Sequence, residues 1–118
     1  MAGEEYLRVS QLDPEVSDMS VLVALKVQGD SERFRAALAE RADEFVAIAD
    51  RAKSLGAIHH RFGIGDGFVL VVDEWESAEQ FESFFSDAEL QAFIASVGAS
   101  GGPPEITVTE ATHSPDEF

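Results

Sequence analysis

The chain of 118 residues contains no cysteine and few basic residues. The absence of cysteine excludes disulfide bonds, thiolate metal sites and cysteine nucleophiles. Only 8 lysines and arginines stand against 23 acidic residues, which gives a net charge of −15. A nucleic-acid-binding protein needs a basic surface that displaces counterions from phosphate, so nucleic acid is not expected as a partner.

The chain also lacks a long hydrophobic run. No apolar stretch approaches the roughly 20 residues of a membrane-spanning helix, and the acidic excess argues against a basic helix on a membrane surface. Residues 1–6 carry two glutamates and no basic cluster, so no signal peptide is expected. We therefore expect a cytoplasmic protein without membrane contact, and a chain of this length accommodates one domain.

The first patterned stretch is Ser20–Val27, which is apolar and rich in β-branched residues. This pattern predicts a strand that is buried on both faces. Apolar residues then recur at helical spacing over Phe34–Leu55, which predicts one helix of about six turns. Either Asp30 or Ser31 can cap its first turn, and Gly56 is placed to end it.

Two further strands are predicted at Ala57–Ile64 and Phe68–Trp75. The glycine-rich residues 65–67 between them indicate a hairpin with a three-residue turn. Counting outward from that turn places His59 opposite Asp73 on one face of the hairpin. The neighbouring histidine then lies on the other face, because successive strand residues alternate.

Two capping boxes mark a second helical region. Ser77–Gln80 begins one helix and Ser86–Glu89 begins another, because the apolar stripe changes phase between them. The glycine- and proline-rich stretch Gly98–Pro104 predicts a flexible connection. Alternating β-branched residues over Glu105–Thr112 predict a last strand.

The order strand, helix, strand, strand, helix, strand is typical of the α+β ferredoxin-like fold (βαββαβ). Its antiparallel four-stranded sheet carries two helices on one face. We expect this domain at residues 20–112, between a polar leader (residues 1–19) and an acidic tail (residues 113–118). The strands are apolar on both faces, yet the helices cover only one, so a homodimer packed through the sheets is expected.

Several short segments share their residues and their order with a known family. They are Gly65-Asp66-Gly67, Val69–Val72, Trp75-Glu76-Ser77, Phe81 and Gly102-Pro103-Pro104. Through them the chain resembles the antibiotic biosynthesis monooxygenase family, part of the dimeric α+β barrel superfamily. The resemblance implies a dimeric α+β barrel with a pocket between the sheet and the helices of each subunit. Active members oxidise polycyclic phenols to quinones with O₂ and without metal or flavin, so no cofactor is expected.

The resemblance also implies which residues bind the substrate. Trp75 matches a family tryptophan at the end of the third strand. Quinone-forming members have an asparagine four residues before it and a tyrosine six residues after it, where this chain has Val71 and Phe81. Many members have a histidine nine residues after it, where this chain has Phe84. Haem-cleaving members carry a histidine near the position of Ile94, which cannot ligate iron.

His59, His60 and Arg61 form the one polar cluster within the predicted strands, and we predict them as catalytic residues. A histidine would remove the proton of a phenol to make an anion that O₂ attacks, and an arginine would stabilise that anion. Asp73 opposite His59 would fix the tautomer of that histidine. The alternative is a solvated cross-strand pair worth about 0.2–1 kcal/mol. Adjacent strand residues point to opposite faces, so the two histidines are not expected to share a metal ion.

Two functions follow from these observations. One is a cofactor-independent monooxygenase that acts on an aromatic or polyketide-like small molecule, as the family resemblance implies. The alternative is a non-catalytic dimeric α+β barrel that binds a small apolar ligand or has a structural role, which the missing asparagine, tyrosine and histidine favour. A cavity open to a tricyclic ring and lined by histidine and tryptophan would favour the enzyme. A cavity filled by Phe81, Phe84 and Phe85 would favour the alternative.

Overall fold

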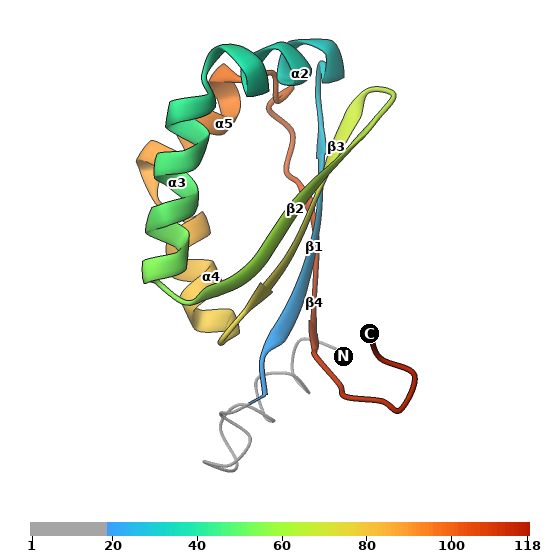
Figure 1. The fold of residues 1–118 in the computed structure, drawn as a ribbon. Helices are drawn as coiled ribbons and strands as arrows, with labels where there is room; N and C mark the ends of the chain where they lie inside the picture. The colour runs from blue at the N-terminus through green and yellow to red at the C-terminus, as the bar shows by residue number, and fades with distance from the viewer. Residues whose placement is uncertain (1–18) are drawn as a thin grey trace.

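The computed structural model describes residues 19–118, so the predicted leader lies outside the described residues except for Met19 (Figure 1). The expected order of strands and helices is confirmed, with each predicted helical region divided into two helices. The elements are β1 (Val21–Gln28), α2 (Ser31–Glu40), α3 (Ala42–Ser54), β2 (Ala57–Gly65), β3 (Phe68–Trp75), α4 (Ala78–Phe85), α5 (Ala88–Ser96) and β4 (Glu105–Glu110).

The four strands form one sheet in the order β2-β3-β1-β4, and every neighbouring pair is antiparallel. All four helices lie on the same side of this sheet (Figure 1). This arrangement is the predicted α+β ferredoxin-like fold. Within residues 19–118, no helix has the length and apolarity needed to cross a membrane.

The central strand β1 shows how the two faces of the sheet differ. Val21, Val23 and Leu25 point toward the helices and are buried, whereas Leu22 between them is 46% exposed. Burial of β1 on both faces was expected, but a single chain buries only the face under the helices. We call this the inner face, and the opposite face the outer face.

The predicted first long helix is interrupted at Arg41, where the backbone leaves the helical region (φ −121°, ψ 35°). Asp30 caps α2 by accepting a hydrogen bond from the backbone N–H of Arg33, one of the two caps that the sequence allows. Gly56 follows Leu55, the C-cap residue of α3, with a φ of 121°, a conformation that favours glycine.

The hairpin differs from its predicted register. Gly65 pairs with Phe68, so the turn holds two residues instead of three, and each partner shifts by one. His60, and not His59, therefore lies opposite Asp73. A bulge between Ala57 and His59 absorbs the shift, and the predicted pairing of Ala57 with Trp75 is retained. One displaced residue is enough to exchange the faces of a strand, because side chains alternate with a period of two.

The second helical region breaks and restarts as predicted. Ser77 caps α4, and its hydroxyl accepts from the backbone N–H of Gln80. Asp87, and not Ser86, caps α5 by accepting from the backbone N–H of Leu90. The predicted cap was therefore wrong by one residue. Asp87 has the extended backbone of an N-cap residue, whereas Ser86 is the C-cap residue of α4.

Candidate functional site

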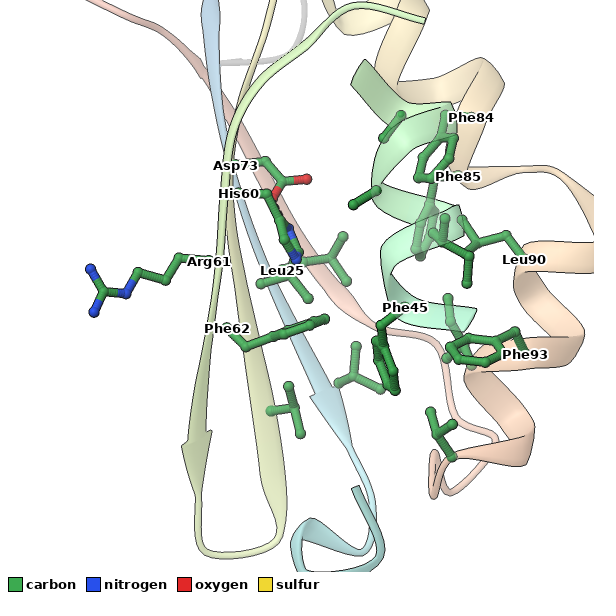
Figure 2. A pocket seen from close by; sticks show the side chains of 18 of the residues that line it. Leu25, Phe45, His60, Arg61, Phe62, Asp73, Phe84, Phe85, Leu90 and Phe93 are labelled. Atoms are coloured by element: carbon green, nitrogen blue, oxygen red, sulfur yellow. Dashed lines mark hydrogen bonds and ion pairs between the residues drawn. The ribbon is translucent and has the colours of Figure 1, made fainter. Parts of the chain in front are cut away.

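A cavity of about 690 Å³ lies between the inner face of the sheet and the helices. This volume falls within the roughly 300–1,000 Å³ of typical small-molecule pockets. Its wall is mostly apolar and draws side chains from the sheet and from all four helices, and Figure 2 shows several of them. The apolar residues include Leu25, Phe45, Phe62, Phe85, Leu90 and Phe93.

One connected set of polar side chains enters this apolar wall from β2 and β3. Oδ1 of Asp73 lies 2.7 Å from Nδ1 of His60, and Oδ2 of Asp73 accepts a hydrogen bond of 3.0 Å from Nε1 of Trp75. Asp73 and Trp75 are buried, whereas the His60 side chain is 41% exposed. Both oxygens of the buried carboxylate thus have partners, as buried polar groups require.

These contacts decide which nitrogen of His60 carries the proton. The carboxylate of Asp73 can only accept, so the neutral imidazole donates from Nδ1 and keeps its lone pair on Nε2. The His60 ring extends from the sheet toward the helices, and it packs edge-on against Phe62 with 4.6 Å between ring centroids (Figure 2). A histidine held in this way can remove a proton from a ligand in the cavity.

Phenylalanines form the end of the cavity beyond His60. Phe45 packs edge-to-face on Phe34, Phe62 and Phe93, with ring centroids 5.0 to 6.0 Å apart. Aromatic rings pair favourably with other aromatic rings, edge-to-face or offset-stacked, so this end of the cavity suits a planar aromatic ligand.

Helix α3 covers the cavity without filling it, since none of its residues is buried. Two side-chain contacts join it to α5. Arg51 on α3 lies 3.1 Å from Oδ2 of Asp87 at the start of α5, and Arg41 before α3 donates a hydrogen bond of 2.8 Å to Oγ of Ser96. The backbone N–H of Leu90 and the guanidinium of Arg51 lower the pKa of Asp87 below its ordinary value.

The three predicted catalytic residues do not share one site. His60 points into the cavity. His59 borders the cavity, but its side chain lies on the outer face, where Nε2 is 4.0 Å from Oε1 of Glu74 and the side chain is 77% exposed. Arg61 borders the cavity, but its side chain extends from the outer face, away from the other labelled residues (Figure 2).

The predicted substrate-binding residues are split between the wall and the core behind it. Val71, Phe81 and Phe84 line the cavity. Trp75 is not among the lining residues and is fully buried, with Phe81 and Phe84 packed on its ring at centroid distances of 5.8 and 5.3 Å. Trp75 is therefore linked to the cavity wall only through Asp73, which lines the cavity and accepts the hydrogen bond of the indole.

The sequence analysis paired Asp73 with the wrong histidine, and it did not identify Phe45 and Phe62 as residues of the cavity wall. A signal for Asp73 was present, because it is the first charge in a strand that is apolar from Phe68 onward. Among residues 19–118, no group of three histidine, aspartate or glutamate side chains is arranged to hold a metal ion.

Comparison with known proteins finds similarity in structure alone. No family model matches the chain. No curated protein matches its sequence. A monooxygenase from the gene ActVA-Orf6 of Streptomyces coelicolor, solved in complex with nanaomycin D, is similar with a TM-score of 0.61 and 19% identity, over 86% of this chain and 93% of that chain.

Two other solved structures are similar over nearly the whole of their own chains. A Nitrosomonas europaea protein of unknown function has a TM-score of 0.59 at 15% identity, over 86% of this chain and 98% of that one. A dimeric ferredoxin-like protein from an uncultured marine organism has a TM-score of 0.58 at 12% identity, over 86% and 96%. The chain has the fold of these proteins. The α+β ferredoxin-like fold expected for the single chain is thereby confirmed.

Proposed function

We propose that this protein is a cofactor-independent monooxygenase that oxidises a flat, aromatic or polyketide-like small molecule in the cavity. The observation that carries the proposal is the His60–Asp73 pair, whose imidazole faces an apolar cavity of about 690 Å³. A base in an apolar, aromatic-lined space suits a phenol that must lose its proton before it reacts with O₂. The fold shared with a monooxygenase supports the proposal.

The chemistry needs one protein base and O₂ as the second substrate. Nε2 of His60 takes the proton of the phenol, and the electron-rich anion passes an electron to O₂. The two radicals combine at the ring carbon as a peroxide anion, which takes the proton back from Nε2 of His60. The hydroperoxide then loses water, together with the remaining hydrogen of the ring carbon, to leave a carbonyl group. In an anthrone, the ring CH₂ thus becomes C=O; one oxygen atom stays in the quinone and the other leaves in water.

Asp73 acts through His60 and not on the substrate. It holds Nδ1 as the donor and faces the imidazolium that forms when Nε2 takes the proton. Trp75 in turn fixes the second oxygen of Asp73. Arg61 has no part in this proposal, because its side chain leaves the sheet on the outer face.

The alternative, a non-catalytic protein that binds an apolar ligand, is favoured by one observation. Phe81 and Phe84 line the cavity at the two positions where the family resemblance implies a tyrosine and a histidine, so neither position supplies a polar group to hold a phenolate oxygen. Under this alternative the cavity binds the same flat molecules and leaves them unchanged.

Oxygen consumption with a panel of anthrones and hydroquinones, in the presence of a chelator, distinguishes the two functions. The monooxygenase consumes one O₂ for each quinone formed, and the chelator leaves the rate unchanged. Binding of the panel without oxygen uptake above the protein-free rate would establish the alternative.

We also propose that two copies of the chain pack through their outer faces, with the sheets forming the barrel. Leu22, Leu70 and Val72 lie together on this face and are 46%, 37% and 51% exposed in the single chain. Soluble proteins rarely leave a contiguous apolar patch of a sheet in water, and a two-fold axis makes such a patch its own partner.

Light scattering tests the dimer directly. The expected mass is twice the 12.8 kDa of one chain at micromolar concentration. Val72→Glu places a charge in the patch and is expected to yield monomers, whereas Ala39→Glu on the exposed surface of α2 leaves the dimer intact. A wild-type monomer would contradict the proposal.

A further inference from the structure

We propose that the cavity selects its ligands by charge: it takes neutral polycyclic phenols and excludes analogues that carry a carboxylate. This inference rests on the proposed function in that the same cavity is the ligand site. It goes beyond that function by naming which members of a broad class of aromatic molecules can enter.

The first argument is that no lysine or arginine side chain serves the interior of the cavity. Among the described residues, only Lys53 and Arg61 of these two types line it. The side chain of Lys53 is 68% exposed and lies 3.3 Å from Oδ1 of Asp50. Arg61 extends from the other face of the sheet (Figure 2). A carboxylate inside the cavity therefore finds neither of them.

Two arginines near the ends of α3, Arg51 and Arg41, form their contacts outside the cavity. Arg51 pairs with Asp87 and lies over the Phe84 ring, with 5.4 Å from its Cζ to the centroid. Arg41 pairs with Glu44 and donates to Oγ of Ser96 at 2.8 Å. Neither arginine lines the cavity.

The second argument is that the interior already holds a negative charge. Asp73 is a buried carboxylate that accepts from Trp75 and His60, and another anion beside it would be repelled in a medium that screens poorly. His60 becomes a cation only by taking up a proton. A ligand carboxylate paired with that cation would occupy the base that the phenol needs.

The third argument is the cost of dehydration. An ionised carboxylate loses its water on entering an apolar cavity, and that loss is large unless a cation or several donors replace the water. Apolar side chains supply most of the wall, so the cost is not recovered. The selectivity therefore arises because the site offers a carboxylate ligand neither a cation nor enough hydrogen-bond donors to replace its water.

A matched pair of ligands tests the inference on the wild-type protein. The probes are 6-hydroxy-2-naphthamide and 6-hydroxy-2-naphthoate, which share one ring system and differ in charge. Isothermal titration calorimetry at neutral pH is expected to show the amide binding at least about tenfold more tightly than the carboxylate. Equal affinities, tighter binding of the carboxylate, or binding of neither probe would overturn the inference.

Salt separates the cavity from the charge of the whole chain. Repulsion by the net charge of −15 is screened at about 500 mM salt, whereas dehydration and the buried Asp73 are screened little. The preference for the amide is expected to persist. If the preference disappears in high salt, it comes from the net charge of the chain and not from the cavity, and the inference is refuted.

A variant with an inward cation sharpens the test. Ile48 lines the cavity from α3 and is half-buried, so Ile48→Lys can extend its amine into the space while the helix stays in place. It is expected to bind the carboxylate at least about tenfold more tightly than wild type, and Ala39→Lys, which adds the same charge outside, is not. Equal gains in both variants would contradict the inference, and circular dichroism verifies that both fold. If the amide binds but no substrate of the oxygen panel is oxidised, the proposed function fails and the charge selectivity stands.

Discussion

Two histidine–carboxylate pairs lie side by side on the same two strands and face opposite ways. On the inner face, His60 and Asp73 are 2.7 Å apart, and the carboxylate side chain is 9% exposed. On the outer face, His59 and Glu74 are 4.0 Å apart, and their side chains are 77% and 27% exposed. The two pairs are therefore one residue apart on each strand, but only His60 and Asp73 are within hydrogen-bond distance of each other.

The difference comes from the surroundings and not from the residue types. Trp75 donates to the inner carboxylate, the inner histidine packs on Phe62, and the helices cover both. The outer carboxylate accepts from the hydroxyl of Ser20, and its histidine is left in solvent. Chemistry that needs one defined tautomer belongs to the inner pair.

The largest expected contrast is between His60→Gln and His59→Gln. Loss of a general base costs about 100- to 10,000-fold in rate, so quinone formation should nearly cease in the first variant. The second variant should retain at least about half of the wild-type rate, because the exposed side chain of His59 lies on the outer face beside Glu74. Anaerobic stocks mixed with O₂ allow both rates to be followed by absorbance. Equal losses in both would remove the distinction between the two faces.

The apolar residues of β1 offer a matched contrast in stability. Leu25 is 2% exposed on the inner face, and Leu25→Ala is expected to lower the free energy of unfolding by about 2–5 kcal/mol. Leu22 lies on the outer face, so Leu22→Ala should act through dimerisation and grow weaker as the protein is diluted. Urea unfolding at two protein concentrations measures both. A concentration-independent loss in Leu22→Ala as large as that in Leu25→Ala would contradict this assignment of the faces.

The smallest of the three contrasts concerns the carboxylates. Asp73→Asn keeps the size of the side chain and removes its obligatory acceptor role, so His60 loses its fixed tautomer and the rate falls about 10- to 100-fold. Glu74→Gln is the outer control and should change the rate less than about twofold. Because Asp73 acts through His60, the loss should appear in kcat with KM little changed. A loss confined to KM would assign Asp73 to ligand binding instead.

Much of the fold follows from local patterns, and the site follows less well. The predicted helix ends are confirmed at Gly56, which has a positive φ, and at Ser77, whose hydroxyl caps α4. Asp30 caps α2 and is one of the two caps that the sequence allows. The hairpin was read with one turn residue too many, and that residue exchanged His59 for His60 as the partner of Asp73. The turn is one residue shorter because Gly65 and Phe68, which flank it, pair with each other as the last residues of the two strands. The ring of Phe68 packs against Gly65, a contact that the residue count of the turn does not reveal.

The cavity itself has no local signal in the sequence. Phe45, Phe62 and Phe93 come from α3, β2 and α5, and each fits the apolar stripe of its own element as well as a core residue would. That α3 stands off the sheet enough to leave space depends on the packing of all the layers together. The commitment of Trp75 to Asp73 is similarly a matter of side-chain direction, which spacing alone does not determine.

The central claim is that Asp73 holds His60 with its proton on Nδ1, so that Nε2 is the base in the cavity. Nitrogen NMR of the histidine side chains at a pH where they are neutral measures this directly. The account predicts a protonated Nδ1 and a bare Nε2 for His60, lost in Asp73→Asn, while His59 shows the Nε2-protonated form that free imidazole side chains prefer. A His60 with its proton on Nε2, or one that Asp73→Asn leaves unchanged, would contradict the account.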